Sequence, residues 1–352
     1  MRQPASPALS RYLAVAFTLL AVYASLHPLT GWHDSGAAAT DFLLAGWPRY
    51  TTAFDLAVNF AAYLPLGFLW VSALMPRLGL AGAVILATVG GGALSFGMEA
   101  LQNYLPSRVP SNLDLACNTL GALAGALAGA RWGHQLLDGG RLHGLRVRHF
   151  LAGNMGDAGL LLMGLWLLSQ LTPETLLFAN GDLRSLLGLP APMHYSAQRF
   201  AEVEAAIVCG HTLAIALLAT RLGRHGERLP VLFLLLAALA LKSLVLALSL
   251  SGARGFAWTT PGSLVGMGLG LGFWLAATLL AARLQQALAA LALLFATVLV
   301  NLAPDNPYLA NTWQTWNPGQ FLNFNGLTKL VASVWPFLAL PWLMMLRAER
   351  KT

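Results

Sequence analysis

Charged residues are scarce in this chain of 352 residues, since Asp, Glu, Lys and Arg together make up 10% of it. A soluble domain carries about 25% of these residues, so this chain cannot cover a water-facing surface of ordinary polarity. Hydrophobic residues make up 57% of the sequence, and its mean hydropathy is +0.63. The composition excludes an ordinary soluble domain and predicts an all-α, polytopic integral membrane protein.

The chain also lacks the common sequence signatures of metal, nucleotide and covalent chemistry. Its two cysteines, Cys117 and Cys209, lie within apolar stretches and form no C-x-x-C pair. There is no Walker loop, dinucleotide fingerprint or G-x-S-x-G elbow, and the histidines show no metal-ligand spacing. We therefore predict no metal and no cofactor.

The formal net charge of +7 does not indicate a nucleic-acid partner, because the basic residues fall between apolar stretches and form no basic stripe with interleaved aromatics. Fourteen of the 21 Lys and Arg residues would lie on one side of the membrane if both termini were cytoplasmic. Because Lys and Arg are enriched in cytoplasmic loops, we predict that both termini lie inside and that the number of spans is even.

Ten apolar stretches are long enough to cross the bilayer core, which takes about 20 residues. They cover residues 11–29, 55–75, 79–102, 113–131, 152–171, 200–220, 229–250, 260–282, 285–303 and 327–346. A basic stretch separates the first four from the last six. We predict a four-helix membrane domain at 1–132, a basic cytoplasmic loop at 133–150 and a second membrane domain of about six helices at 151–352.

A weak internal repeat marks the outer ends of the first, fifth and ninth stretches. These ends read Leu26-His27-Pro28, Leu171-Thr172-Pro173 and Leu302-Ala303-Pro304. Duplicated modules are common in membrane transporters, but proline after a helix end is expected in any case. The repeat is therefore a hypothesis of four-helix modules, the last of them truncated.

Polar residues gather at one predicted depth, at the outer ends of the second, third and fourth stretches. They are Asp55, Asn59, Tyr63, Glu99, Gln102, Asp114 and Asn118. Arg108 lies between Pro106 and Pro110 in the linker that joins two of these stretches. Because ionisable residues inside a membrane are costly and usually functional, we predict a polar pocket here that opens to the outer face.

Glycines recur every fourth residue at Gly121, Gly125 and Gly129, a spacing that lets membrane helices approach closely. The polar residues also have structural explanations. Ser111 and Asp114 fit a capping box, the amides suit interhelical hydrogen bonds, and Glu99 with Arg108 suits a structural ion pair. Lys242, the most isolated charge, could pair with Glu202 or Glu204 or extend its stem toward water.

These residues resemble the VanZ-like family of bacterial membrane proteins. The resemblance rests on the run N-F-A-A-Y-L-P-L-G from Asn59 to Gly67, on Glu99-x-x-Gln102, on Arg108, and on Asp114, Asn118 and Gly121. It covers the first four stretches only. It implies the bacterial inner membrane and a link to envelope polysaccharide or to low-level resistance to lipoglycopeptide antibiotics, and it assigns no reaction; the predicted topology places the site on the extracytoplasmic side.

Three functions remain open at this point. The first is binding of an anionic lipid, a lipid-linked glycan or a lipoglycopeptide, with Arg108 holding the anionic group and Asn59, Tyr63, Gln102 and Asn118 orienting it. The second is an intramembrane enzyme with Glu99 or Asp114 as acid or base. The third is a scaffold of an envelope assembly in which the polar residues are structural.

Overall fold

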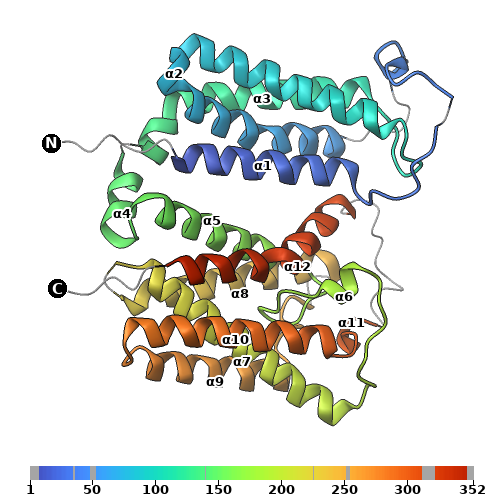
Figure 1. Ribbon diagram of the computed structural model, residues 1–352. Coiled ribbons are helices and arrows are strands. Elements are labelled where there is room, and N and C mark those ends of the chain that lie inside the picture. Colours follow the sequence, from blue (N-terminus) through green and yellow to red (C-terminus); the bar gives the residue numbers. More distant parts are fainter. Residues whose placement is uncertain are drawn as a thin grey trace. The chain divides into compact units, whose positions relative to one another are not determined.

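A computed structural model describes residues 8–34, 36–47, 53–138, 140–224, 226–250, 254–310 and 322–346. The described chain is all-helical, apart from one isolated bridge between Phe150 and Gly223. It divides into two compact units, unit 1 (Met1–Arg148) and unit 2 (His149–Thr352). Each unit has its own packed helices, and each is described separately (Figure 1).

Unit 1 is built from three long helices and several short ones. The long helices are α1 (Ala8–Leu26), α2 (Ala53–Gln102) and α3 (Asn112–Gly133). A 3₁₀ turn, η1 (Asp41–Leu43), lies between α1 and α2. The stretch predicted as a basic loop contains a π-helical turn, η2 (His134–Asp138), and the short helix α4 (Arg141–His149).

The long helix α2 folds back on itself at Gly79. This residue has φ 69° and ψ 179°, a conformation that glycine adopts without the steric cost of a Cβ atom. Val71 on the first arm packs with Ala83 and Ala87 on the second arm, so the arms run antiparallel (Figure 1). The two arms correspond to the predicted spans 55–75 and 79–102.

The glycine face of α3 packs directly against the backbone of the first arm of α2. A Cβ atom on Gly125 would collide with the carbonyl oxygen of Leu64, and one on Gly129 would lie 2.6 Å from the carbonyl oxygen of Phe68. Such contacts require glycine, because any side chain would push the helices apart. The predicted close approach at these glycines is confirmed.

Unit 2 contains four long helices and four of 17 residues or fewer. The helices are α5 (Gly153–Ser169), α6 (Leu183–Leu186), α7 (Ala197–Leu222), α8 (Arg228–Leu250), α9 (Pro261–Ala277), α10 (Ala282–Leu302), α11 (Pro307–Ala310) and α12 (Leu322–Met345). Of these, α5 and α9 have 17 residues each, and α6 and α11 have four each. Helix α7 has most of its residues buried and contacts α5, α8, α9 and α10.

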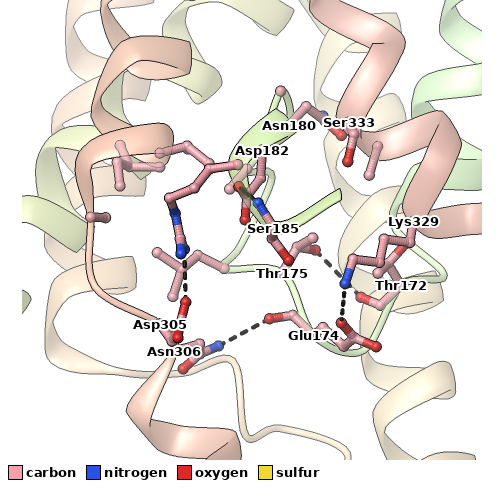
Figure 2. A pocket seen from close by; sticks show the side chains of 18 of the residues that line it. Thr172, Glu174, Thr175, Asn180, Asp182, Ser185, Asp305, Asn306, Lys329 and Ser333 are labelled. Atoms are coloured by element: carbon pink, nitrogen blue, oxygen red, sulfur yellow. Dashed lines mark hydrogen bonds and ion pairs between the residues drawn. The ribbon is translucent and has the colours of Figure 1, made fainter. Parts of the chain in front are cut away.

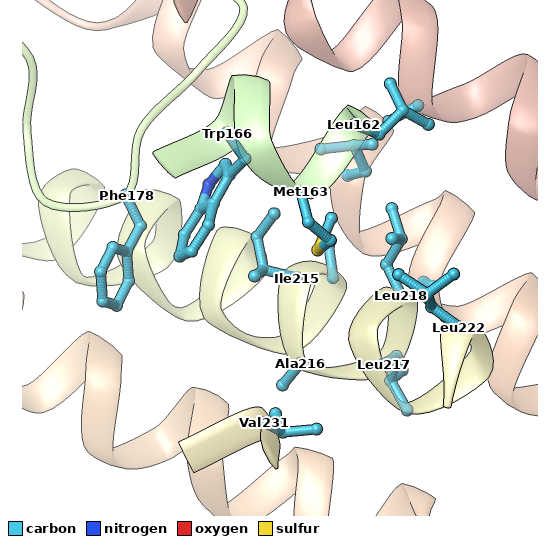
Figure 3. Close-up of a cluster of buried hydrophobic side chains, with 14 of the residues drawn as sticks. Leu162, Met163, Trp166, Phe178, Ile215, Ala216, Leu217, Leu218, Leu222 and Val231 are labelled. Carbon is cyan, nitrogen blue, oxygen red and sulfur yellow. The ribbon is translucent and has the colours of Figure 1, made fainter. Parts of the chain in front are cut away.

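The core of unit 2 forms between α5, α7 and α12. Trp166 of α5 and Ile215 of α7 are fully buried, and Phe178 packs against Trp166 (Figure 3). Two indole groups of α12 donate hydrogen bonds to carbonyl oxygens of α5, from Trp335 to Leu162 and from Trp342 to Met155, both at 2.8 Å. These two bonds give the buried indole N–H groups their partners and fix how α12 sits on α5.

The same helix contact recurs in both units at a constant sequence offset. In unit 1 a Cβ atom would meet a backbone carbonyl in the pairs Gly121 with Phe60, Gly125 with Leu64, and Gly129 with Phe68. In unit 2 the pairs are Gly262 with Ala201, Gly266 with Ala205, and Gly270 with Cys209. Every residue in the second set stands 141 positions after its counterpart in the first. The packing therefore supports a repeat of the first two predicted modules, with α7 matching the first arm of α2 and α9 matching α3.

All ten predicted spans are helical, and seven helices among the described residues are long and apolar enough to cross a membrane. One of the seven is α2, which contains two of the predicted spans. Helices α5 and α9 have 17 residues each, fewer than the roughly 20 that a simple crossing takes. The chain is thus an all-helical protein with candidate membrane spans, while ten crossings and cytoplasmic termini stay predictions.

Candidate functional site

The seven polar residues that the sequence placed at one depth, together with Arg108, lie at one end of unit 1. Here α1 ends, the second arm of α2 ends, and the first arm of α2 and α3 begin. The α2 hairpin and the short linker before α3 bring residues of four segments to the same level. We call this group the unit 1 polar cluster; its members are Asn59, Tyr63, Glu99, Gln102, Arg108, Asp114 and Asn118.

Glu99 binds the first turn of α3. Its side chain is 3% exposed, and its Oε2 accepts the backbone N–H of Ser111 at 2.8 Å. Ser111 in turn accepts the backbone N–H groups of Leu113 and Asp114 through its hydroxyl oxygen. Ser111 is therefore the N-cap of α3, as predicted, but the carboxylate that completes the cap comes from α2 and not from Asp114.

Asp114 faces the first arm of α2 instead of its own N-cap. The side chain of Asn59 lies within hydrogen-bonding range of the Asp114 carboxylate, and the charge of Asp55 acts on it as well. Asp114 and Glu99 also lie close enough for their charges to interact. The predicted grouping of Asn59 with the two carboxylates is present in the structure.

Tyr63 and Asn118 meet near Ser95 in the interior of the cluster. The Asn118 amide nitrogen donates to the Ser95 hydroxyl at 2.9 Å, and Ser95, Ser25 and Glu99 are polar neighbours of the Tyr63 side chain. Both Tyr63 and Asn118 are buried. The Tyr63 hydroxyl and the Asn118 amide oxygen have no hydrogen-bond partner among the described residues.

Arg108 and Gln102 hold the end of α1. Arg108 donates from Nη2 to the carbonyl oxygen of His27 at 2.6 Å, and Gln102 donates to the carbonyl oxygen of Ser25 at 2.8 Å. Burial lowers the pKa of the Arg108 guanidinium, while the Glu99 carboxylate opposes that shift. Glu99 is thus a carboxylate whose charge acts on Arg108, and Gln102 contributes to packing of the helix ends.

Lys242 has a different environment from the one predicted. Its side chain is 1% exposed, and Nζ donates to the carbonyl oxygens of Thr172 and Thr175, both at 2.7 Å, and to the Thr175 hydroxyl at 3.1 Å. Among the described residues, Lys242 forms no ion pair with Glu202 or Glu204, the two partners suggested from the sequence; Glu204 instead accepts hydrogen bonds from the hydroxyl groups of Thr260 and Tyr308.

Sequence reasoning missed the contact of Ser95 within the cluster and the hydrogen bonds that the polar residues of unit 2 make. Serine is small and common, and nothing in the sequence shows that Ser95 accepts a hydrogen bond from Asn118. Thr172 was noticed only as part of the repeated Leu-x-Pro motif. The link from Lys242 to Thr172 spans 70 residues, and no local pattern could reveal it.

The fold and this cluster define a class of protein, an all-helical membrane protein whose first unit carries buried polar and charged groups at one helical end. Residues 8–132 match the sequence model of the VanZ/LLP1 family, which confirms the predicted resemblance for the N-terminal helices. The match covers unit 1 up to the end of α3 and stops before unit 2. A comparison with curated proteins and one with solved structures gave no match.

Proposed function

We propose that this chain is a VanZ-like protein of the bacterial inner membrane whose polar cluster binds the headgroup of an envelope amphiphile. The ligand class is an anionic lipid, a lipid-linked glycan or a lipoglycopeptide. The observation that carries the proposal is that the buried Tyr63 hydroxyl and Asn118 amide oxygen lack partners among the described residues. A buried polar group without a partner costs about 1–3 kcal/mol, and a bound headgroup would remove that cost.

The Tyr63 hydroxyl and the Asn118 amide oxygen differ in the hydrogen bonds that they can form with a ligand. The Tyr63 hydroxyl can donate a hydrogen bond, whereas the Asn118 amide oxygen can only accept one. A sugar or glycerol hydroxyl does both, and the Arg108 guanidinium beside Glu99 favours an adjacent phosphate or carboxylate. A hydroxylated, anionic headgroup therefore fits the cluster better than a simple acyl chain or a free cation.

The loop beside the cluster supports an approach from the membrane surface. Trp32 is 44% exposed and Trp47 is 79% exposed, and tryptophan is enriched where the bilayer meets water. The predicted orientation, with both termini in the cytoplasm, would place this loop and the cluster on the extracytoplasmic side. An amphiphile in the outer leaflet would then reach the cluster directly.

The test is native mass spectrometry of the purified full-length chain, reading which lipids remain bound. Tyr63→Phe removes only the hydroxyl group that has no partner in the described structure, and Tyr12→Phe, at an exposed position on α1, is the matched control. We expect the wild type and Tyr12→Phe to retain one defined amphiphile. Tyr63→Phe should retain about tenfold less of it, the effect of losing roughly 1.4 kcal/mol of binding free energy.

Arg108 is tested in the same way, with Arg108→Gln beside Arg131→Gln at the exposed other end of α3. Because Arg108 also binds the His27 carbonyl, thermal midpoints of both variants must be measured alongside. Loss of the anionic amphiphile from Arg108→Gln alone, with the fold intact, supports the proposal. Bulk lipid in the wild type, or equal retention by Tyr63→Phe, contradicts it.

A second candidate is an enzyme acting on an envelope lipid or glycan, favoured by the closeness of Glu99 and Asp114. Glu99→Gln separates the candidates, since the amide oxygen of glutamine can still accept the Ser111 N–H but cannot transfer a proton. An enzyme would lose turnover of its headgroup substrate completely. A binding protein would lose only part of its affinity, and a scaffold would be unaffected.

A further inference from the structure

Unit 2 contains a cavity of about 400 Å³ where α5 and α10 end and α12 begins. The volume falls within the range of roughly 300–1,000 Å³ seen for small-molecule sites. Figure 2 shows side chains from the loop after α5, from the loop after α10 and from α12 around this space. The cavity lies outside the residues matched by the VanZ/LLP1 family.

The loop that forms one wall is tied down from several sides. Lys242 holds the carbonyl oxygens of Thr172 and Thr175. His211 is fully buried; its Nδ1 lies 3.0 Å from the carbonyl oxygen of Ile207, and its Nε2 lies 3.2 Å from the backbone nitrogen and 3.1 Å from the carbonyl oxygen of Asn180. A backbone held in this way lowers the entropic cost of binding a ligand.

The next residue of the loop is fixed as well. The Asn301 amide nitrogen donates to the carbonyl oxygen of Gly181 at 2.7 Å, and the Gly181 N–H donates to the carbonyl oxygen of Ala332 at 2.8 Å. Helices α10 and α12 therefore both bind the loop at this point. The backbone of the cavity wall is therefore held by hydrogen bonds at this point.

The charged residues around the cavity are paired with one another. Lys329 lies 3.3 Å from Glu174, and Arg184 lies 2.7 Å from Asp305 (Figure 2). The remaining charged lining residue, Asp182, caps α6 by accepting the N–H of Ser185. The lining thus has three carboxylates and two cations, which gives it no excess of positive charge and disfavours a phosphate or a carboxylate ligand.

Two uncharged groups that line the cavity have no partner in the described structure. They are the Thr172 hydroxyl and the Asn180 amide oxygen, and their residues are 0% and 1% exposed. The rest of the wall is largely aliphatic, including Leu176, Ile207 and Val300. The cavity therefore combines aliphatic surface with neutral hydrogen-bonding groups and closed ion pairs.

We infer that this cavity binds a neutral polyhydroxylated molecule, a sugar of one or two rings. Sugar hydroxyls both donate and accept, so they can satisfy the Asn180 amide oxygen and the Thr172 hydroxyl. Neighbouring hydroxyls can also bridge the Lys329–Glu174 pair without separating its charges. The C–H faces of a sugar ring suit the aliphatic wall. This site belongs to unit 2 and does not depend on the proposed function of unit 1.

The test is calorimetric titration of the purified full-length chain with glucose, N-acetylglucosamine and maltose, and with inorganic phosphate and glycine as probes of other ligand classes. Thr172→Val removes the hydroxyl that has no partner in the described structure and leaves the backbone carbonyl that Lys242 binds. The matched control is Thr212→Val, a buried threonine that bonds only to its own helix at Val208 and is outside the cavity lining.

We expect saturable binding of at least one sugar to the wild type and to Thr212→Val. Binding to Thr172→Val should be about tenfold weaker, the effect of one lost hydrogen bond in a buried site. Lys329→Met, which opens one ion pair, should weaken binding as well. Binding of phosphate or glycine but no sugar, absence of any sugar binding, or equal affinity in Thr172→Val would overturn the inference.

Discussion

Replacing Gly266 by alanine should separate α9 from α7 and lower the stability of unit 2. A Cβ atom at Gly266 would collide with the carbonyl oxygen of Ala205 and would lie 2.9 Å from the Cβ atom of Val208. Both obstacles are close to the backbone of α7, so no side-chain rotation can relieve them. Overpacking of this kind costs about 1–3 kcal/mol.

The chain offers a matched control two residues away. Gly268 lies on the same helix, is exposed, and has no heavy atom within 4 Å of where its Cβ would be. Gly268→Ala should be neutral or stabilise the helix by up to about 1 kcal/mol, because alanine has the higher helix propensity. The two variants make the same chemical change, so the difference between them measures the helix contact alone.

The assay is the apparent thermal midpoint of each purified variant in the same detergent, read as the fraction that remains monodisperse after heating. The midpoint of Gly266→Ala should lie below that of the wild type, and the midpoint of Gly268→Ala should lie at or above it. If both variants have the same midpoint, α9 does not pack on α7 through its glycines. The constant offset of 141 residues between the contacts of the two units would then not be evidence of a repeated helix contact.

Three further outcomes follow from other contacts. Gly125→Ala should destabilise unit 1 in the same way that Gly266→Ala destabilises unit 2. The control is Gly97→Ala, because a Cβ atom at Gly97 would have no heavy atom within 4 Å. Equal thermal midpoints of Gly125→Ala and Gly97→Ala would contradict the repeat. Lys242→Met should destabilise unit 2 by about 1–3 kcal/mol, because the buried carbonyl oxygens of Thr172 and Thr175 lose their hydrogen-bond donor. The Thr172–Thr175 loop should then become accessible to protease. An unchanged thermal midpoint would mean that removal of the buried charge offsets the lost hydrogen bonds. Trp335→Phe should cost about 1–3 kcal/mol by removing the bond to Leu162, whereas Trp132→Phe, at a half-exposed position on α3, should be neutral in the same thermal assay.

Hydropathy was sufficient to locate the helices, because a run of about 20 apolar residues has few stable alternatives to a helix. The glycine face of α3 was also predictable, since close approach of two helices requires small residues at a spacing of four. The turn at Gly79 was expected only as a boundary between spans. Its left-handed backbone explains why both arms of α2 pack on one helix.

The polar contacts were predictable as a group but not as pairs. Ser111 was correctly identified as the N-cap of α3, yet the carboxylate that completes the cap comes from Glu99, 12 residues earlier on another helix. Local sequence favours the nearer Asp114, whereas tertiary packing turns Asp114 toward Asn59. The cavity of unit 2 was missed because its members come from the ends of three helices and follow no common motif.

The Leu-x-Pro motif shows how the two units are alike and where they differ. A proline has no N–H to offer the carbonyls at a helix end, and in each unit a cation binds the carbonyl just before it. Arg108 binds His27 in unit 1, and Lys242 binds Thr172 in unit 2. Arg108 precedes α3, whereas Lys242 lies within α8, so the cations that make the two contacts do not occupy matching positions in the repeat. Tyr63 and Glu204, 141 positions apart, likewise differ in chemistry at matched places in the repeat. The repeat therefore preserves helix packing, while the polar residues at the ends of the two units differ.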